Sequence, residues 1–156
     1  MARRHQIEKR ILTPDPKFNS ELVAKIINFV MRCGKKAVAE KIVYGALDQI
    51  KEKIKKDPLE VLVNAINNIK PKVEVKSRRV GGATYQVPTE ISSNRQMALS
   101  LRWLVQFSKS RKGVSMEKAM AMEIMDAYNN QGNTIKKRDD THKMAQANKA
   151  FAHYAW

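Results

Sequence analysis

Residues 76–88 read KSRRVGGATYQVP. Apolar residues alternate on both sides of the central Gly81-Gly82, as they do in paired strands: Val73, Val75, Tyr85 and Val87. The two glycines supply the positive φ angles that a tight hairpin turn requires. The sequence therefore predicts a β-hairpin over about residues 72–88.

The predicted hairpin carries positive charge on both faces. Arg79 shares a face with the valines, whereas Lys76 and Arg78 share the other face with Glu74. A strand with charge on both faces near its tip buries neither of them, so the tip should project from the rest of the molecule. We also expect the tip to be mobile, because the glycines add backbone freedom and nothing apolar is expected to anchor it. Positive charge concentrated on a thin arm indicates a large anionic partner.

The composition of the whole chain agrees with such a partner. Its 156 residues include 30 Lys and Arg against 15 Asp and Glu, which gives a net charge of +15. With 43% hydrophobic residues, the chain has enough apolar material for a core, and its length suggests one folded domain. A strongly basic folded domain is typical of nucleic-acid binding.

Several other functions find no support in the sequence. The single cysteine, Cys33, cannot form an internal disulfide, and the histidines (His5, His142 and His153) lack the spacing of a zinc site with it. We therefore expect no metal and no cofactor. No apolar run reaches the length needed to cross a bilayer, and no secretory signal follows the basic start, so no membrane is expected. Asp139, Asp140 and His142 could form an acid–base set, but adjacent carboxylates on a helix point apart, and we expect no enzyme.

The remaining sequence predicts helices. Residues 1–18 form a basic arm with Pro14 and Pro16, and residues 19–156 form a single domain. A first helix begins after Asn19 or Ser20 and ends at Gly34, and a second spans about residues 36–55. The third begins at Pro58 with Asp57 as its cap, Ser93 and Ser115 are the expected caps of the fourth and fifth, and the last spans about residues 134–150. The predicted fold is mainly α, an all-α bundle of about six helices with one protruding β-hairpin.

Apolar spacing also predicts which helix faces are buried. We expect the second helix to bury a face made of Val38, Ile42, Leu47, Ile50 and Ile54, and its Gly45 to permit a close helix crossing. Trp103 and Phe107 are expected in the core. Tyr85 could stack on a base or cover the hairpin root. The aromatic residues near the C-terminus could dock back onto the bundle or form a partner surface: Phe151, Tyr154 and Trp156.

The basic residues gather in clusters at the ends of the predicted elements and in loops. The clusters are the arm (Arg3, Arg4, Lys9, Arg10), the first connection (Lys35, Lys36), the hairpin (Lys76, Arg78, Arg79), the loop before and into the fifth helix (Lys109, Arg111, Lys112, Lys118) and the start of the last helix (Lys136, Lys137, Arg138). At the last helix, basic side chains together with free backbone N–H groups would form a phosphate clamp. No helix carries a face of base-reading residues, so recognition of phosphate and shape in folded RNA is favoured over reading of DNA.

Several strings resemble the family of small-subunit ribosomal protein seven, bacterial type. They are VKSRRVGG at residues 75–82 with YQVP at 85–88, LRWL at 101–104, and MA at 144–145 followed by ANKAFAHY at 147–154. Lys70-Pro71, Gly34-Lys35-Lys36 and Asp15-Pro16 also match. The resemblance extends from the arm to the last residues.

The resemblance implies a helical bundle with a protruding hairpin that binds the 3′ major domain of small-subunit ribosomal RNA and organises the head of the subunit. It further implies that exit-site transfer RNA and messenger RNA lie near the hairpin and last helix, and that small-subunit protein eleven is a neighbour. It places the protein in the cytoplasm, within the small ribosomal subunit, with an organellar ribosome as the alternative. The basic residues of the arm, first connection and hairpin match RNA-facing positions of the family; those of the 109–118 loop match less closely because that loop varies.

Two other functions remain open from the residues alone. The first is a free basic DNA-binding protein of the nucleoid type, and the second, less favoured, is a basic ribonuclease.

Overall fold

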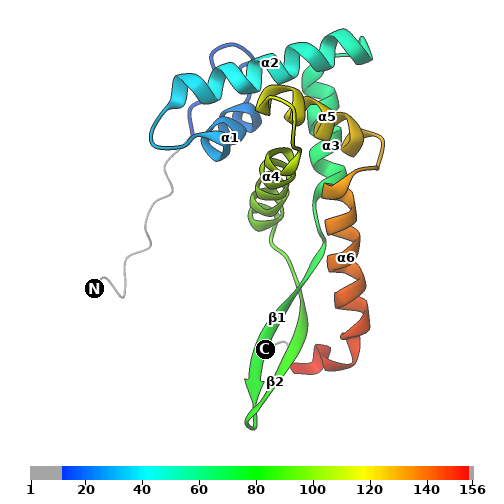
Figure 1. Ribbon diagram of the computed structural model, residues 1–156. Helices are drawn as coiled ribbons and strands as arrows, with labels where there is room; N and C mark the ends of the chain where they lie inside the picture. Colours follow the sequence, from blue (N-terminus) through cyan, green and yellow to red (C-terminus); the bar gives the residue numbers. More distant parts are fainter. Residues whose placement is uncertain (1–11, 155–156) are drawn as a thin grey trace, which may run out of the picture.

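The computed structural model describes residues 12–154 and shows a helical bundle from which a hairpin projects (Figure 1). The elements follow one another as α1 (Glu21–Val30), α2 (Lys36–Ile54), α3 (Pro58–Ile69), β1 (Val73–Val80), β2 (Ala83–Glu90), α4 (Ser93–Ser110), α5 (Met116–Tyr128), α6 (Asn133–Ala147) and a 3-10 helix, η1 (Lys149–Tyr154). This order confirms the predicted mainly-α fold with one β-hairpin.

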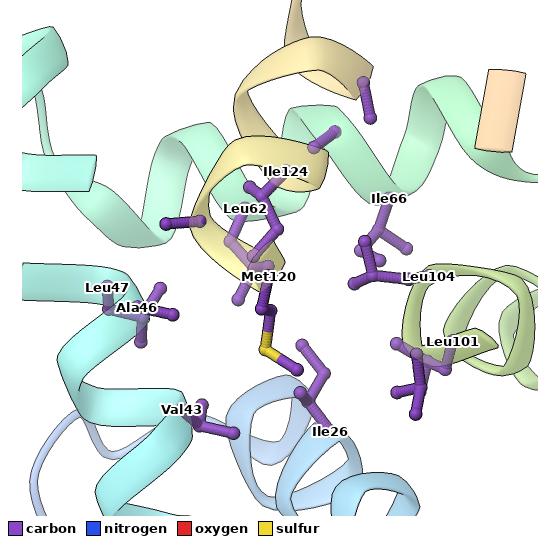
Figure 2. Packing of buried hydrophobic residues seen from close by; sticks show 14 of the residues in the cluster. Ile26, Val43, Ala46, Leu47, Leu62, Ile66, Leu101, Leu104, Met120 and Ile124 are labelled. Carbon is purple, nitrogen blue, oxygen red and sulfur yellow. The ribbon is translucent and has the colours of Figure 1, made fainter. Parts of the chain in front are cut away.

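The bundle is organised around α5. Met120 of α5 lies at the centre of the core, and apolar side chains from the other helices surround it, among them Ile26, Val43, Leu62 and Leu104 (Figure 2). Gly45 lies where α5 approaches α2, and a Cβ atom there would collide with the Glu117 carboxylate. The close crossing predicted at this glycine is therefore present.

Two details of the first two helices differ from the prediction. Helix α1 ends at Val30, before Gly34, because Met31 already leaves the helical conformation and both Cys33 and Gly34 adopt positive φ. On α2, Val38 is 55% exposed, so its assignment to the buried face was wrong. The buried face instead includes the alanines Ala39 and Ala46. Small side chains suit this face because α5 packs closely against it.

The predicted helix starts are mostly confirmed. Asp57 caps α3 by accepting a hydrogen bond from the Leu59 N–H at 3.2 Å, with Pro58 in the first turn. Ser115 caps α5 in the same way. The start of α4 is shifted by one residue, since Ser92 is the cap, and the Gln96 side chain bonds back to the Ile91 carbonyl oxygen at 3.0 Å. Trp103 is buried, as predicted.

The hairpin spans residues 73–90, close to the predicted 72–88, and its two strands pair without interruption. The antiparallel ladder runs from the Val73–Glu90 pair to the Val80–Ala83 pair. Gly81 and Gly82, both with positive φ, form the turn. The hairpin points away from the bundle, and α6 runs from the bundle toward η1, which lies beside the hairpin (Figure 1).

Residues 12–18 pack against the bundle instead of extending from it. The buried Asp15 carboxylate accepts hydrogen bonds from the backbone N–H groups of Lys17 and Phe18, each at 3.1 Å, and from the Tyr44 hydroxyl at 2.7 Å. The hydrogen bond to Asp15, together with burial and the nearby negative charge, raises the pKa of Tyr44 to about 12. Asp15 thereby fastens this segment to α2.

Candidate nucleic-acid interface

Two of the predicted basic clusters meet at one surface depression. Lys35 from the α1–α2 connection and Lys109 from the end of α4 line it together with Arg32. These residues come from segments more than seventy positions apart in the sequence. Arg32 was not among the predicted site residues, although its position two residues before Gly34 in the same connection was a usable signal.

The positive charges around this depression lie close enough to affect one another. Burial lowers the pKa of Lys109, and the nearby Arg32 guanidinium lowers it further. Of the residues described, none that lines the depression is acidic. We call this depression, with Arg32, Lys35 and Lys109 at its rim, the cationic pocket.

Of the other residues in these two clusters, three have side chains exposed to solvent, whereas Arg111 does not. Lys36 lies beside Glu40 one turn along α2, with its Nζ 3.6 Å from the carboxylate. Lys112 and Lys118 are exposed, in the loop and in the first turn of α5. All three side chains reach solvent, where an external anion could approach them.

Arg111, by contrast, is held inside the fold. Its guanidinium donates to the fully buried Glu123 carboxylate at 2.9 Å from Nε and 2.6 Å from Nη2, and it also bonds to Asp126. Burial alone would lower the pKa of Arg111, but the two carboxylates raise it above its usual value. This geometry gives Arg111 a structural role, whereas its predicted contact with RNA stays a prediction.

The start of α6 already holds a carboxylate. The other Glu123 oxygen accepts hydrogen bonds from the Thr134 backbone N–H, at 3.1 Å, and from the Thr134 hydroxyl. The Thr134 N–H is therefore not free for the predicted phosphate clamp, because the protein supplies the anion at this helix end. Lys136 and Lys137 are exposed, so these two side chains still reach solvent.

Arg138, the third basic residue of that cluster, also contacts the protein. Its guanidinium donates to the carbonyl oxygen of Asn68 and to the Asp139 carboxylate, at 2.8 Å from Nε. The bond to Asn68 ties α6 to α3, and the bond to Asp139 lies within α6. The prediction that Arg138 binds RNA remains untested.

An ion pair lies at the root of the hairpin, and the basic residues of the hairpin lie between it and the turn. Glu74 is buried, and Arg95, in the first turn of α4, forms two parallel hydrogen bonds with it, at 2.7 and 2.8 Å. These bonds are the main reason that the pKa of Glu74 is lowered, and Lys76, 3.5 Å away, contributes as well. Arg79 is exposed, and Arg78 pairs with Tyr85 in the ladder. Arg95 was not predicted from the sequence, because no local pattern connects it to the hairpin.

An aromatic cluster packs against the hairpin in the half that lies nearer its turn. The Tyr85 ring lies 5.2 Å from that of Phe151 and 5.3 Å from that of Tyr154, measured between centroids. Phe151 and Tyr154 therefore dock on the hairpin and not on the bundle, which was the docking place predicted from the sequence if these rings packed on the protein. The helix η1 anchors the hairpin at Tyr85 through these rings, while the mobility of the tip at Gly81-Gly82 stays a prediction.

Some of the predicted site residues lie outside residues 12–154: Arg3, Arg4, Lys9 and Arg10 of the arm. Within that range, no group of His, Cys, Asp and Glu residues is arranged to hold a metal ion. Over the same range, no helix combines the length and apolar character of a membrane span.

A helical bundle whose cations gather at connections and on a braced hairpin defines a basic, mainly-α protein suited to a large anionic partner. Comparison with known proteins identifies the family to which it belongs. The family model described as Ribosomal protein S7p/S5e matches residues 2–149. Proteins named small ribosomal subunit protein uS7 are similar over all 156 residues and over their own full lengths: 58% identical in Anaeromyxobacter sp. (strain Fw109-5), 57% in Thermodesulfovibrio yellowstonii and 56% in Desulfatibacillum aliphaticivorans. The chain belongs to the ribosomal protein S7 family and is a structural, non-enzymatic component of the small ribosomal subunit.

Proposed function

We propose that the protein binds the 3′ major domain of small-subunit ribosomal RNA directly and organises assembly of the subunit head. The observation that carries this proposal is the cationic pocket, where Arg32, Lys35 and Lys109 gather with no acidic residue in the described lining. A cluster of like charges that the protein itself does not neutralise is favourable only when an external anion approaches it. The exposed Lys112 and Lys118 extend this positive surface across the α4–α5 connection.

The mechanism is neutralisation of phosphates on a rigid support. Basic side chains displace counterions from the RNA, and the bundle fixes the relative orientation of the RNA helices that meet on it. The basic arm of residues 1–18 would add Arg3, Arg4, Lys9 and Arg10 to the contact, while the single domain proposed over residues 19–156 would act as the support.

The hairpin and α6 have a second role in this proposal. They would lie near exit-site transfer RNA and the path of messenger RNA, with small-subunit protein eleven as a neighbour, in ribosomes of the cytoplasm. The exposed Arg79 at the projecting end of the hairpin supports a contact beyond the main RNA surface. Exposed Lys136 and Lys137 supply positive charge at the other end of α6.

A salt titration of binding tests the main proposal. The wild-type protein should bind a transcript of the 3′ major domain more tightly than duplex DNA of equal length. Changing Lys35 and Lys36 to Gln together should reduce the affinity and flatten the dependence of log K on log salt by about 0.7–0.9 for each phosphate that these lysines neutralise. Equal affinity for the transcript and for duplex DNA would favour a nucleoid-type DNA binder instead. An unchanged slope would mean that these lysines do not bind phosphate.

A further inference from the structure

The base of the cationic pocket is apolar. Val38, Ile42 and Met116 line it, together with Val30, Met31 and Ala39, around a volume of about 260 Å³. Sites for drug-sized ligands occupy roughly 300–1,000 Å³, so this space suits a single flat ring system. Val38 is 55% exposed, so its apolar surface is open to a ligand that enters the pocket.

The rim of the pocket is entirely cationic among the charged residues described there. Arg32 comes from the α1–α2 connection, Lys35 precedes α2 directly, and Lys109 lies in the last turn of α4. An apolar floor with cations around it is complementary to a nucleotide, whose base is flat and weakly polar on its faces and whose phosphates are anionic.

We propose that the cationic pocket holds one unstacked base of the bound RNA, with the flanking phosphates on Arg32, Lys35 and Lys109. This assignment rests on the proposed function, since it names the part of the RNA that this site takes. Proteins that recognise RNA commonly take bases from loops and bulges, where an unpaired base is free to leave the stack. The base would cover Val38 and Met116, and the guanidinium plane of Arg32 is available to stack against it.

A protein side chain is the rival occupant of this pocket. An apolar side chain would fill the floor, but its own chain would cover the rim and remove water from Arg32, Lys35 and Lys109 without supplying negative charge. Such desolvation of unpaired cations is costly. A nucleotide fills the floor and neutralises the rim together, so the charge pattern favours RNA.

The test separates the floor of the pocket from its rim. Val38→Ser removes apolar surface without removing charge, and Val63→Ser is a matched control, because Val63 is a 44% exposed valine on α3 outside the pocket. With the 3′ major-domain transcript as the probe, Val38→Ser should weaken binding roughly three- to tenfold, as expected when base stacking is partly removed. The salt dependence should stay as in the wild type. Val63→Ser should bind as the wild type does.

A cross-link locates the base directly. The transcript made with 4-thiouridine and irradiated in the complex should attach to peptides that contain residues 30–42 or 109–116. The rim variant, Lys35→Gln with Lys109→Gln, should reduce both affinity and salt slope.

The outcomes distinguish this inference from the proposed function. If Val38→Ser binds as tightly as the wild type, or if Val63→Ser loses as much affinity, no base occupies the pocket, although the protein still binds RNA. Cross-links that fall only outside these peptides would overturn the inference in the same way. If the wild type shows no salt-dependent preference for the transcript, the proposed function itself fails. Val38→Thr, which keeps the shape of the side chain, should lose less affinity than Val38→Ser if apolar packing against a base is responsible.

Discussion

Arg111 and Glu123 form an ion pair that joins three parts of the fold. Arg111 lies in the connection between α4 and α5, and its Nη2 is 2.6 Å from the carboxylate of Glu123, which has no exposed surface. The second oxygen of Glu123 accepts the Thr134 N–H at the start of α6. A cation in one of the predicted basic clusters thus stabilises the protein by pairing with a buried acid.

Removing Arg111 should destabilise the protein strongly. Arg111→Ala leaves the buried Glu123 carboxylate with its Thr134 hydrogen bonds but without the guanidinium charge that neutralises it, and breaking a buried pair from one side typically costs about 3–5 kcal/mol. Lys112→Ala, at the exposed next position, should change the free energy of unfolding by less than about 0.5 kcal/mol. Urea unfolding followed by circular dichroism measures both values.

A double variant checks that the uncompensated charge is the cause. Arg111→Met combined with Glu123→Gln should recover part of the stability, because a neutral side chain at 123 still accepts a hydrogen bond from Thr134. If Arg111→Ala unfolds like the wild type but binds RNA weakly, Arg111 is an RNA-binding residue and its structural assignment is wrong.

The N-terminal arm should be separable from the fold at Asp15. Deleting residues 1–10 should leave the melting temperature unchanged, because Asp15 still holds residues 12–18 through Tyr44 and two backbone N–H groups. The deletion should nevertheless weaken binding to the transcript, since it removes Arg3, Arg4, Lys9 and Arg10. Asp15→Ala should do the reverse, costing about 1–3 kcal/mol by leaving hydrogen-bond donors unsatisfied. A large drop in melting temperature on deleting residues 1–10 would contradict this separation.

Stability should fall in mild acid because of His142. The Lys72 backbone N–H donates to His142 Nε2 at 3.0 Å, which requires that nitrogen to be unprotonated. Burial, followed by the positive charges of Arg138 and Lys72, lowers the pKa of His142, while Asp139 opposes this. A lowered pKa in the folded state means that this contribution is complete above the unfolded value of about 6.5 and is lost as the pH falls through the folded value.

Comparing melting temperatures at pH 7.5 and pH 5 tests this prediction. The decrease between these two pH values should be smaller in His142→Gln than in the wild type, because an amide at this position does not titrate in that range. His153→Gln serves as the control, since His153 is exposed near the end of η1. Identical decreases in the wild type and in His142→Gln would show that other groups cause the acid sensitivity.

Much of the fold could be predicted because its signals are local. Asp57-Pro58 and Ser115 mark helix starts through bonds within a few residues, and Gly81-Gly82 marks the hairpin turn in the same way. The buried face of α2 was harder to predict. The pattern favoured the large Val38, whereas the close approach of α5 selects small residues such as Ala39, and that approach depends on how distant segments pack.

The candidate site could be predicted only in part for a similar reason. Clusters of cations were visible in the sequence, but their tertiary partners were not. Arg111 and Lys109 lie two residues apart, yet one is paired with Glu123 and the other lines the cationic pocket. Likewise, Glu74 is a lone acid on a basic strand in the sequence, whereas in the fold Arg95 lies beside it. Residue type alone does not distinguish a cation that stabilises the fold from one that is available to RNA.

The hairpin should be held in place by the aromatic cluster of Tyr85, Phe151 and Tyr154. Replacing both Phe151 and Tyr154 with Ala removes the rings that pack on β2, so hydrogen exchange should quicken in residues 76–87, while amides of α2 and α5 keep their protection. The root should stay protected, because Arg95 still pairs with Glu74 there. Met144→Ala, at an exposed position on α6, is the control.

We expect the double variant at Phe151 and Tyr154 to bind the 3′ major-domain transcript normally and to enter subunits. It should hold exit-site transfer RNA less tightly, because a loosened hairpin presents Arg78 and Arg79 less accurately. Shortening residues 77–84 to a minimal turn should give the same later defect. A block at the first RNA-binding step in either variant would mean that the hairpin is a primary anchor for RNA, and unchanged exchange in the first variant would mean that the rings do not brace it.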